Sequence, residues 1–226
     1  MIKVVARQNG RWDNAIYNLQ PMFIKEEEHF LDYHFYMNEN IFAGTNEYRG
    51  FDIRSLRFRG QNISQVSYSN QGAEAFVMPD VSRNKRNLTQ YIDLNGRFVI
   101  ENFETRQGSV EADYVDVYFK LVLNEPTKDK IYLFGLFSDW ELRPDMQMTP
   151  DSTNEKVRLG HAKVKQGFYN YSYVVVGPDK KPDEIVLEGS YSQAENMYDI
   201  LVYFRPLGGR YDQLVGYTDV DYNKLK

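Results

Sequence analysis

The stretch Ile131-Tyr132-Leu133-Phe134-Gly135-Leu136-Phe137-Ser138-Asp139-Trp140 is the most informative part of the chain. Its apolar and aromatic residues on both sides of one glycine predict a buried β-strand. Gly135 indicates a bulge or a close backbone neighbour, and Ser138-Asp139 favours a tight turn. Trp140 has two interpretations. It is a core residue folded back over its own strand, or an aromatic platform for a sugar ring.

Further strands are predicted on both sides of this stretch. Asp113–Asn124 shows the clearest alternation, with Val, Phe and Leu on one side and Tyr, Asp and Lys on the other. Asn95-Gly96 predicts a hairpin between Tyr91-Ile92 and Phe98–Ile100. The other predicted strands are Ile2–Arg7, Phe30–Met37, Ile63–Tyr68, Glu74–Met78, Lys156–Val164, Phe168–Val176, Tyr198–Arg205 and Gln213–Tyr217.

No stretch of ten or more residues carries a convincing helical periodicity. Short strands separated by Gly, Pro and Asn-Gly turns therefore predict an all-β chain made of two antiparallel β-sandwich domains. We place their boundary at Gln107-Gly108-Ser109, which gives domains of residues 1–108 and 109–226.

Composition excludes several classes of function. The 226 residues include 18 Tyr, 14 Phe and 2 Trp, and the net charge is −5. This charge argues against binding to nucleic acid or anionic lipid. The absence of cysteine removes disulfides, thiolate nucleophiles and Cys-ligated zinc. No signal-peptide pattern opens the chain, and no apolar run approaches the ~20 residues of a membrane helix, so no membrane insertion is expected. The start in mid-strand suggests a fragment of a longer protein.

Residues that carry chemistry are scattered. His29, His34 and His161 have no metal-ligand spacing, and no Gly-x-Ser-x-Gly motif is present. Asp219-Val-Asp-Tyr-Asn223 resembles half of a calcium loop without its glycine. No pattern places two carboxylates across a sugar. We therefore expect no catalytic residue, no metal, no cofactor and no small-molecule substrate.

The arginines between residues 49 and 59 allow several interpretations. They could bind phosphate, form the exposed face of an edge strand, or pair with the chain's own carboxylates. Arg and Tyr are also enriched at protein interfaces, so a partner surface is a further possibility.

The second predicted domain resembles an early-set immunoglobulin-like sandwich of the type found in glycogen-binding modules. The resemblance is carried by Val117–Phe119, Tyr132–Trp140, Met146 or Met148, and Lys165–Tyr173. In those modules a second tryptophan follows the last strand, whereas here the chain runs through Val174–Pro178 without one. The resemblance gives an alternative function, an envelope carbohydrate-binding protein that uses Trp140.

A longer resemblance covers nearly the whole chain. The segments Gln8–Ile16, Phe42–Arg57 and Leu187–Tyr198 are similar, in this order, to the plug protein family of the bacterial type IX secretion system. Members of this family are longer, so the chain would be the C-terminal two-thirds or so of one, behind an export signal and a further β-domain. Asp151-Ser152-Thr153 also fits the O-glycosylation pattern of bacteria that use this system.

This resemblance implies a non-enzymatic periplasmic protein associated with the outer membrane. Its partner would be the large outer-membrane barrel of the secretion translocon, which it would occlude while no substrate passes. The matching segments contain residues that either contact the barrel or form internal salt bridges and packing. They are Trp12, Asp13, Asn14, Asn46, Arg49, Asp52, Arg54 and Arg57.

Overall fold

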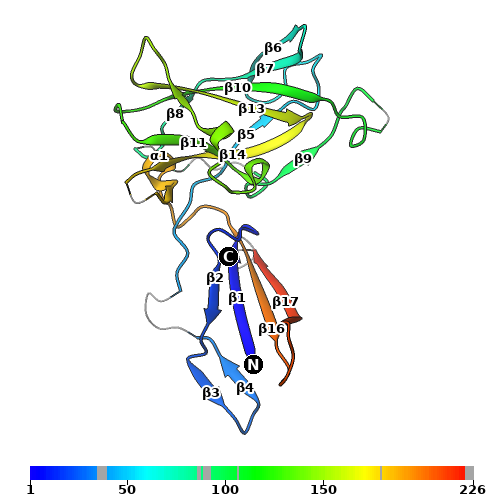
Figure 1. The fold of residues 1–226 in the computed structure, drawn as a ribbon, viewed down its shortest axis with the longest axis vertical. Coiled ribbons are helices and arrows are strands. Elements are labelled where there is room, and N and C mark those ends of the chain that lie inside the picture. Colours follow the sequence, from blue (N-terminus) through cyan, green and yellow to red (C-terminus); the bar gives the residue numbers. More distant parts are fainter. Residues whose placement is uncertain (35–39, 86–87, 89–92, 106, 179, 222–226) are drawn as a thin grey trace. The chain divides into compact units, whose positions relative to one another are not determined.

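The computed structural model describes residues 1–226 except 35–39, 86–87, 89–92, 106, 179 and 222–226. Almost all of its regular elements are strands (Figure 1). The strands are β1 (Ile2–Gln8), β2 (Ile16–Leu19), β3 (Phe23–Lys25), β4 (Phe30–Asp32), β5 (Arg49–Asp52), β6 (Ile63–Ser69), β7 (Gly72–Val77), β8 (Asp80–Val81), β9 (Phe98–Ile100), β10 (Tyr114–Val122), β11 (Lys130–Phe134), β12 (Thr149–Pro150), β13 (Val157–Lys165), β14 (Gly167–Val176), β15 (Pro182–Asp183), β16 (Met197–Phe204) and β17 (Gln213–Asp221). Short helical turns are η1 (Leu136–Ser138), η2 (Pro144–Met146) and α1 (Ile185–Glu188). The all-β prediction is confirmed.

The chain divides into two compact units, but not at the predicted place. Unit 1 consists of residues 1–43 and 195–226, and unit 2 consists of residues 44–194. The predicted boundary at residues 107–109 is wrong because strands on both sides of it share sheets. β7 pairs in parallel with β10, and both β5 and β9 pair with β14. The sequence also predicted two sandwiches, whereas the described residues of unit 1 form one four-stranded sheet and a separate two-stranded hairpin.

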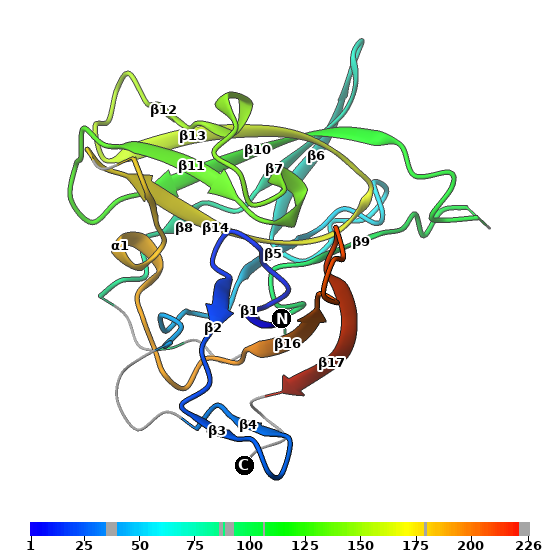
Figure 2. The ribbon, with the colours of Figure 1, turned by 60° about the horizontal axis from the view of Figure 1, so that its bottom comes forward.

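Unit 2 is the β-sandwich. One sheet has the order β12-β13-β10-β7-β6, with β8 beside β10. In the other sheet, the long strand β14 is central and pairs with each of β11, β15, β5 and β9 (Figure 2). The alternating apolar residues of β10, among them Val115, Val117 and Leu121, are buried in the core between the sheets. This arrangement is compatible with an immunoglobulin-like sandwich, although β16 and β17 of the predicted second domain belong to unit 1.

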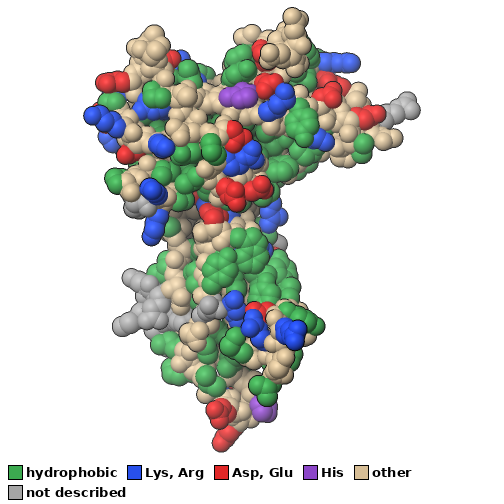
Figure 3. All heavy atoms as spheres, viewed as in Figure 1, with side chains coloured by type: hydrophobic (Ala, Val, Ile, Leu, Met, Phe, Trp, Pro, Cys, Tyr) green, Lys and Arg blue, Asp and Glu red, His purple; other side chains and the backbone are tan. Residues whose placement is uncertain are grey.

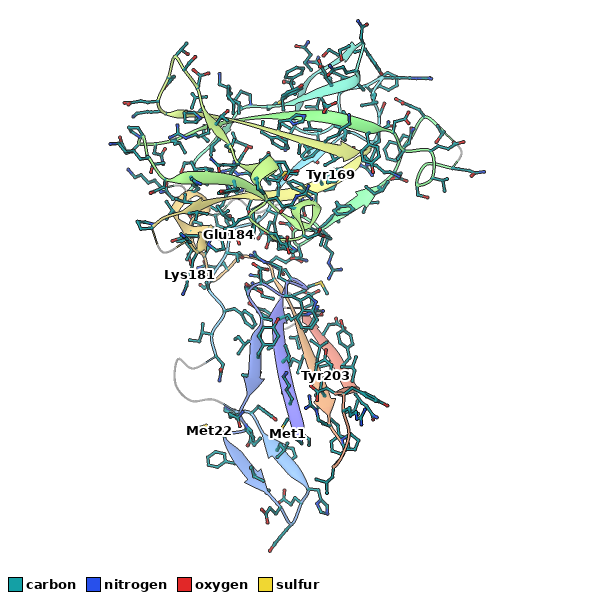
Figure 4. All side chains as sticks on the ribbon, viewed as in Figure 1. Met1, Met22, Tyr169, Lys181, Glu184 and Tyr203 are labelled. Atoms are coloured by element: carbon teal, nitrogen blue, oxygen red, sulfur yellow. The ribbon has the colours of Figure 1, made fainter. Side chains whose placement is uncertain are left out.

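β14 is buried on both faces. Tyr169 (labelled in Figure 4), Tyr171 and Tyr173 point into the main core, where the ring of Phe51 stacks on Tyr169 at a centroid distance of 5.1 Å. On the opposite face, Val174 packs in a second cluster with residues of β11. The three tyrosines of β14 therefore help to fill this sandwich, because each ring buries a large apolar area.

The stretch around Gly135 forms the predicted buried strand and turn. Ile131–Phe134 is buried in β11, and η1 follows immediately. A side chain at Gly135 would come within 3.0 Å of the carbonyl oxygen of Asn170, which agrees with the predicted close backbone neighbour. Asp139 adopts a left-handed φ of 55°, and the amide of Trp140 donates to the carbonyl of Gly135 at 3.1 Å.

Unit 1 joins the two ends of the described chain in one sheet of order β17-β16-β1-β2 (Figure 1). β1 pairs with β16 from Ile2 opposite Phe204 to Gln8 opposite Tyr198. The predicted strand Phe30–Met37 is present only as β4, which pairs with β3, and its last residues lie outside the described part of the chain. The Tyr91-Ile92 arm of the predicted hairpin also lies outside it. Among the described residues, no helix is long and apolar enough to cross a membrane.

Candidate functional site

Arg49 lies at the centre of a buried ion-pair network in unit 2. Its Nε donates to Glu188 Oε1 at 2.9 Å, its Nη1 to Asp80 Oδ1 at 2.7 Å and its Nη2 to the carbonyl of Val81 at 2.8 Å. The guanidinium also lies over the ring of Tyr173, 5.1 Å from its centroid. Every edge of this cation is thus occupied by groups of its own unit.

Glu188 is the shared acceptor of the network. Arg83 Nε donates to its Oε2 at 2.7 Å, and the amide of Tyr173 donates to its Oε1 at 3.0 Å. Burial alone would raise the pKa of Glu188, but Arg49 and Arg83 outweigh this effect and hold its pKa below the ordinary value. The carboxylate therefore stays ionised and serves as an internal anchor.

Asp80, the second carboxylate bound to Arg49, accepts hydrogen bonds from two buried tyrosine hydroxyls. Tyr171 and Tyr173 donate to Asp80 Oδ2 at 2.6 and 2.7 Å. Burial, together with the Asp80 carboxylate, raises the pKa of both hydroxyls. Two neutral phenols, two guanidinium groups and two carboxylates hold one another, so the network stabilises the fold and offers no free acid or base.

Three further predicted residues of unit 2, Asn46, Asp52 and Arg54, are also tied to internal partners. Asn46 Nδ2 donates to the carbonyl of Glu188 at 2.8 Å. Arg54 is paired with Asp52 through Nη2 and Oδ2 at 2.6 Å, and its guanidinium lies 4.4 Å from the ring centroid of Phe103. The internal salt-bridge interpretation is therefore confirmed for Arg49 and Arg54. The edge-strand interpretation is wrong because β5 ends at Asp52, before most of these arginines.

Arg57 lies beside a shallow depression. Its amide donates to Glu104 Oε1 at 2.9 Å, and Arg59 Nη1 donates to the carbonyl of Ser64 at 3.2 Å. The depression encloses about 330 Å³ and is lined by Leu56, Arg57, Phe58, Arg59, Ser64, Gln65 and Val66. No carboxylate or histidine lines it, so it has no general acid or base.

Trp140 is a core residue and not a platform. Only 8% of its surface is exposed, and its ring packs against Phe134 and Tyr48 in T-shaped contacts with centroid distances of 5.4 and 5.8 Å. The ring also lies against Gly96, whose predicted turn has left-handed φ angles at both residues. The proposed sugar platform is therefore wrong, because a sugar needs an exposed ring face.

Trp12, Asp13 and Asn14 are the predicted residues of unit 1; the first two are exposed and Asn14 is half-buried. Asp13 accepts two hydrogen bonds from Arg11, through Nε at 3.0 Å and Nη2 at 2.7 Å. Asn14 Nδ2 donates to Gln8 Oε1 at 3.4 Å. Both polar side chains are thus engaged by neighbours in unit 1. The indole ring of Trp12, a residue that is 47% exposed, is therefore the group of this segment that is most available to a partner.

Trp12 belongs to a row of side chains on one face of the unit 1 sheet, which we call the aromatic face. It consists of Tyr17 on β2, Trp12, Arg7 on β1, Asp199 on β16 and Tyr217 on β17. The rings of Trp12 and Tyr17 lie 6.3 Å apart with an interplanar angle of 20°. Tyr17 and Tyr217 are 52% and 57% exposed. Hydrophobic side chains gather over this sheet in the space-filling view (Figure 3).

Within the aromatic face, Arg7 and Asp199 form an ion pair that lies beneath the exposed rings. Arg7 Nη2 donates to Asp199 Oδ2 at 2.7 Å, while the guanidinium lies 4.3 Å from the centroid of the Trp12 ring. Tyr217 donates its hydroxyl to Asp199 Oδ1 at 3.0 Å, and this bond raises the pKa of Tyr217. The rings are therefore held in place while they remain exposed, which suits a recognition surface.

Sequence analysis missed Arg7, Tyr17, Asp199 and Tyr217. Alternation along Ile2–Arg7 shows that Arg7 shares a face with Lys3 and Val5, but Arg7 and Asp199 are 192 positions apart. No local signal pairs strands at that distance.

The described residues contain no evident centre for catalysis or metal binding. No group of three or more His, Asp or Glu side chains among them is arranged to hold a metal ion. Asp219 and Asp221 of the half calcium loop lie on β17, and Asn223 is outside the described part of the chain. His161 pairs with Asp116 at 2.8 Å on the outer face of the sandwich.

The chain is similar to a solved structure. No protein-family profile and no curated protein matches the chain. A crystal structure of a hypothetical protein from Parabacteroides merdae ATCC 43184 is similar, with 33% sequence identity and a TM-score of 0.87. The match covers 97% of this chain and 55% of that chain, so the chain spans about half the length of the solved protein.

Proposed function

We propose that this chain is part of a non-enzymatic periplasmic protein that docks on the outer-membrane barrel of the type IX secretion translocon and occludes it. The observation that carries the proposal is the aromatic face of unit 1, where Trp12 and Tyr17 are exposed above the Arg7–Asp199 ion pair. The resemblance of three sequence segments to the plug protein family supports the choice of partner.

The physical chemistry of the aromatic face fits reversible docking. Exposed Trp and Tyr rings bury a large area on binding and lose little conformational entropy. Rings that are already positioned reduce the entropy lost on binding further. A rigid sandwich such as unit 2 can obstruct an opening without any chemical step.

Most of the family-motif residues have a different role in this proposal. Asn46, Arg49, Asp52 and Arg54 maintain the internal structure of unit 2, since each is bonded to groups of that unit. Trp12 is the motif residue that we assign to the partner. The location that follows is the periplasm, in association with the outer membrane.

The test uses a bacterial strain that lacks the gene and is complemented with the complete protein. The double variant Trp12→Ala/Tyr17→Ala should no longer co-purify with the translocon barrel from detergent-solubilised envelopes. It should also leave the outer membrane permeable to a large antibiotic. We expect at least a tenfold loss of recovered barrel, since two central aromatic anchors each contribute about 1–2 kcal/mol or more at interfaces.

The matched control is Tyr68→Ala, which removes a tyrosine of unit 2 that is 69% exposed. This variant should retain both the barrel and the permeability barrier. Unchanged permeability in the deletion strain, with no barrel recovered by the unmutated protein, would rule out the proposed function. Retention of the barrel by the double variant would rule out the aromatic face as the docking surface.

A further inference from the structure

The connection between β5 and β6 carries two arginines that the network around Glu188 does not use (Figure 2). Arg57 and Arg59 are both exposed and stand on either side of Phe58, which is 77% exposed. Among the described residues, no carboxylate forms an ion pair with either of them, so their charge is available to a ligand. Other arginines of unit 2 are ion-paired, namely Arg49, Arg54, Arg83 and Arg143.

The main chain of this connection is held in place by Glu104. Its Oε1 accepts hydrogen bonds from the hydroxyl of Ser55 at 2.8 Å and from the amides of Leu56 and Arg57, both at 2.9 Å. The hydroxyl oxygen of Ser55 also accepts a hydrogen bond from the amide of Phe58 at 3.2 Å. Because these bonds use main-chain groups of the connection, substitution of the Arg57 side chain leaves them in place.

The depression of about 330 Å³ joins a cationic side to an apolar side. Arg59 Nη1 donates to the carbonyl of Ser64 on β6 at 3.2 Å, which ties this side chain to the neighbouring strand. The other donors of its guanidinium form no hydrogen bond with the described residues. The remaining lining consists of Arg57, the apolar side chains of Leu56, Phe58 and Val66, and the amide side chain of Gln65.

The charge around the depression favours a monoanion. Burial would raise the pKa of Glu104, but its hydrogen bonds with Ser55 and the main chain, together with the charge of Arg57, hold it below the ordinary value. Arg57 therefore already faces one anion. Two guanidinium charges less one carboxylate leave a net charge of about +1, which matches a carboxylate better than a dianionic phosphate.

We propose that the depression beside Arg57 and Arg59 binds a carboxylate that is carried on an apolar group. The carboxylate accepts hydrogen bonds from the guanidinium groups, whose planar fork matches its two oxygens. The apolar group packs against Leu56, Phe58 and Val66. Two sources have this chemistry, the C-terminus of a polypeptide with an apolar last residue and a free aliphatic acid. The inference goes beyond the proposed function, since it concerns unit 2 and not the aromatic face.

The first probe is the dipeptide acetyl-Ala-Leu with a free C-terminal carboxylate, titrated into the isotope-labelled full chain. Amide chemical shifts should change at residues 56–59 and 64–66. The neutral acetyl-Ala-Leu-amide should bind about tenfold more weakly, because charge-assisted hydrogen bonds are lost. Acetate should also bind about tenfold more weakly, because it buries no apolar group.

Variants test the two arginines. Arg57→Gln and Arg59→Gln should each raise the dissociation constant of acetyl-Ala-Leu by about tenfold, since glutamine can donate a hydrogen bond but carries no charge. The control Arg97→Gln changes an exposed arginine of unit 2 outside the depression and should leave the dissociation constant unchanged. The comparison between the free acid and the amide uses the unmutated protein, so it remains decisive if a variant fails to fold.

Isocaproate separates the two sources, because it has the side chain and carboxylate of leucine without the peptide. Equal binding of isocaproate and the dipeptide would assign the site to free aliphatic acids, and binding of the dipeptide alone would assign it to a polypeptide C-terminus.

Four outcomes would overturn the proposal. The amide binds as well as the free acid, or no probe shifts the amides that line the depression. In the third, Arg97→Gln weakens binding as much as the other two variants. In the fourth, inorganic phosphate binds more tightly than the dipeptide, which would show that the site takes a dianion.

Discussion

At the scale of single residues, the motif positions fall into two groups: buried charged residues that are paired inside unit 2, and an exposed aromatic residue in unit 1. Arg49 and Glu188 are both buried and both fully engaged, whereas Trp12 is exposed although it comes from an equally distinctive segment. A buried charge contributes to stability only while its partners remain, because the unpaired charge would be left without water. The arginines of the motif are therefore best tested through stability and the tryptophan through binding.

We predict that Glu188→Gln destabilises unit 2 by about 3–5 kcal/mol, because Arg49 and Arg83 lose their shared counter-ion. Urea unfolding at neutral pH measures this change. The control Glu125→Gln removes an exposed carboxylate, 3.6 Å from Lys156, and should change the free energy of unfolding by less than about 1 kcal/mol. Equal stability of the two variants would contradict the anchoring role of Glu188.

The same carboxylate predicts a pH dependence. The folded-state pKa of Glu188 lies below its ordinary value of 4.5, so folding favours the ionised form. Its contribution is fully present above about pH 4.5 and is lost as the pH falls through the folded-state pKa. The stability gap between the unmutated protein and Glu188→Gln should therefore narrow below that pH. A gap that widens in acid would show that Glu188 is not stabilised as the anion.

At the scale of elements, tight turns fix which strands meet. The Asn95-Gly96 turn before β9 has φ angles of 52° and 80°, and the ring of Trp140 lies directly against Gly96. The Asn95-Gly96 turn and the Trp140 ring, which follows β11, therefore pack against each other, although they are more than 40 positions apart. A local turn signal thus has a long-range consequence.

We predict that Gly96→Ala destabilises unit 2 by about 2–4 kcal/mol. About 1 kcal/mol comes from the left-handed backbone. The rest comes from a methyl group placed 2.5 Å from the Trp140 ring, which the core must move to accept. Gly72→Ala is the control in the same unit, since its φ is also positive but nothing lies within 4 Å. Denaturant unfolding that gives the same loss for both variants would contradict the contact with Trp140.

At the scale of the whole molecule, the two units differ in how the chain builds them. Unit 2 is continuous and contains both hydrophobic clusters together with the Arg49–Glu188 network. Unit 1 is discontinuous, because β1 from the beginning of the chain pairs with β16 from near its end. Unit 1 therefore depends on both chain segments being present.

We predict that a fragment of residues 44–194 folds and unfolds cooperatively by itself, as measured by near-UV circular dichroism during denaturant unfolding. A fragment of residues 1–194 lacks β16 and β17, so β1 loses its pairing partner. Limited proteolysis should cleave this fragment before residue 44 much faster than it cleaves the full chain. An unfolded 44–194 fragment, or equal protease resistance of 1–194, would contradict the division into units.

The sequence by itself determined most of the longer strands and a tight turn. Alternation of apolar and polar residues located β10 and β13, and Asn95-Gly96 located a turn, because side-chain direction and left-handed φ are local properties. For the arginines between residues 49 and 59 it offered pairing with carboxylates as one of several interpretations. Which strands pair was beyond it, since main-chain hydrogen bonds are the same for every residue and distant pairings leave no local pattern.

Only the tertiary structure decided how these strands are shared between units. It placed β7 beside β10 across the predicted boundary and joined Arg7 to Asp199 under Trp12. It also distinguished the two tryptophans, burying Trp140 against Gly96 and leaving Trp12 exposed. The physical reason is common to all three. Burial and ion pairing depend on what lies opposite a residue in space, and local sequence specifies only the side to which that residue points.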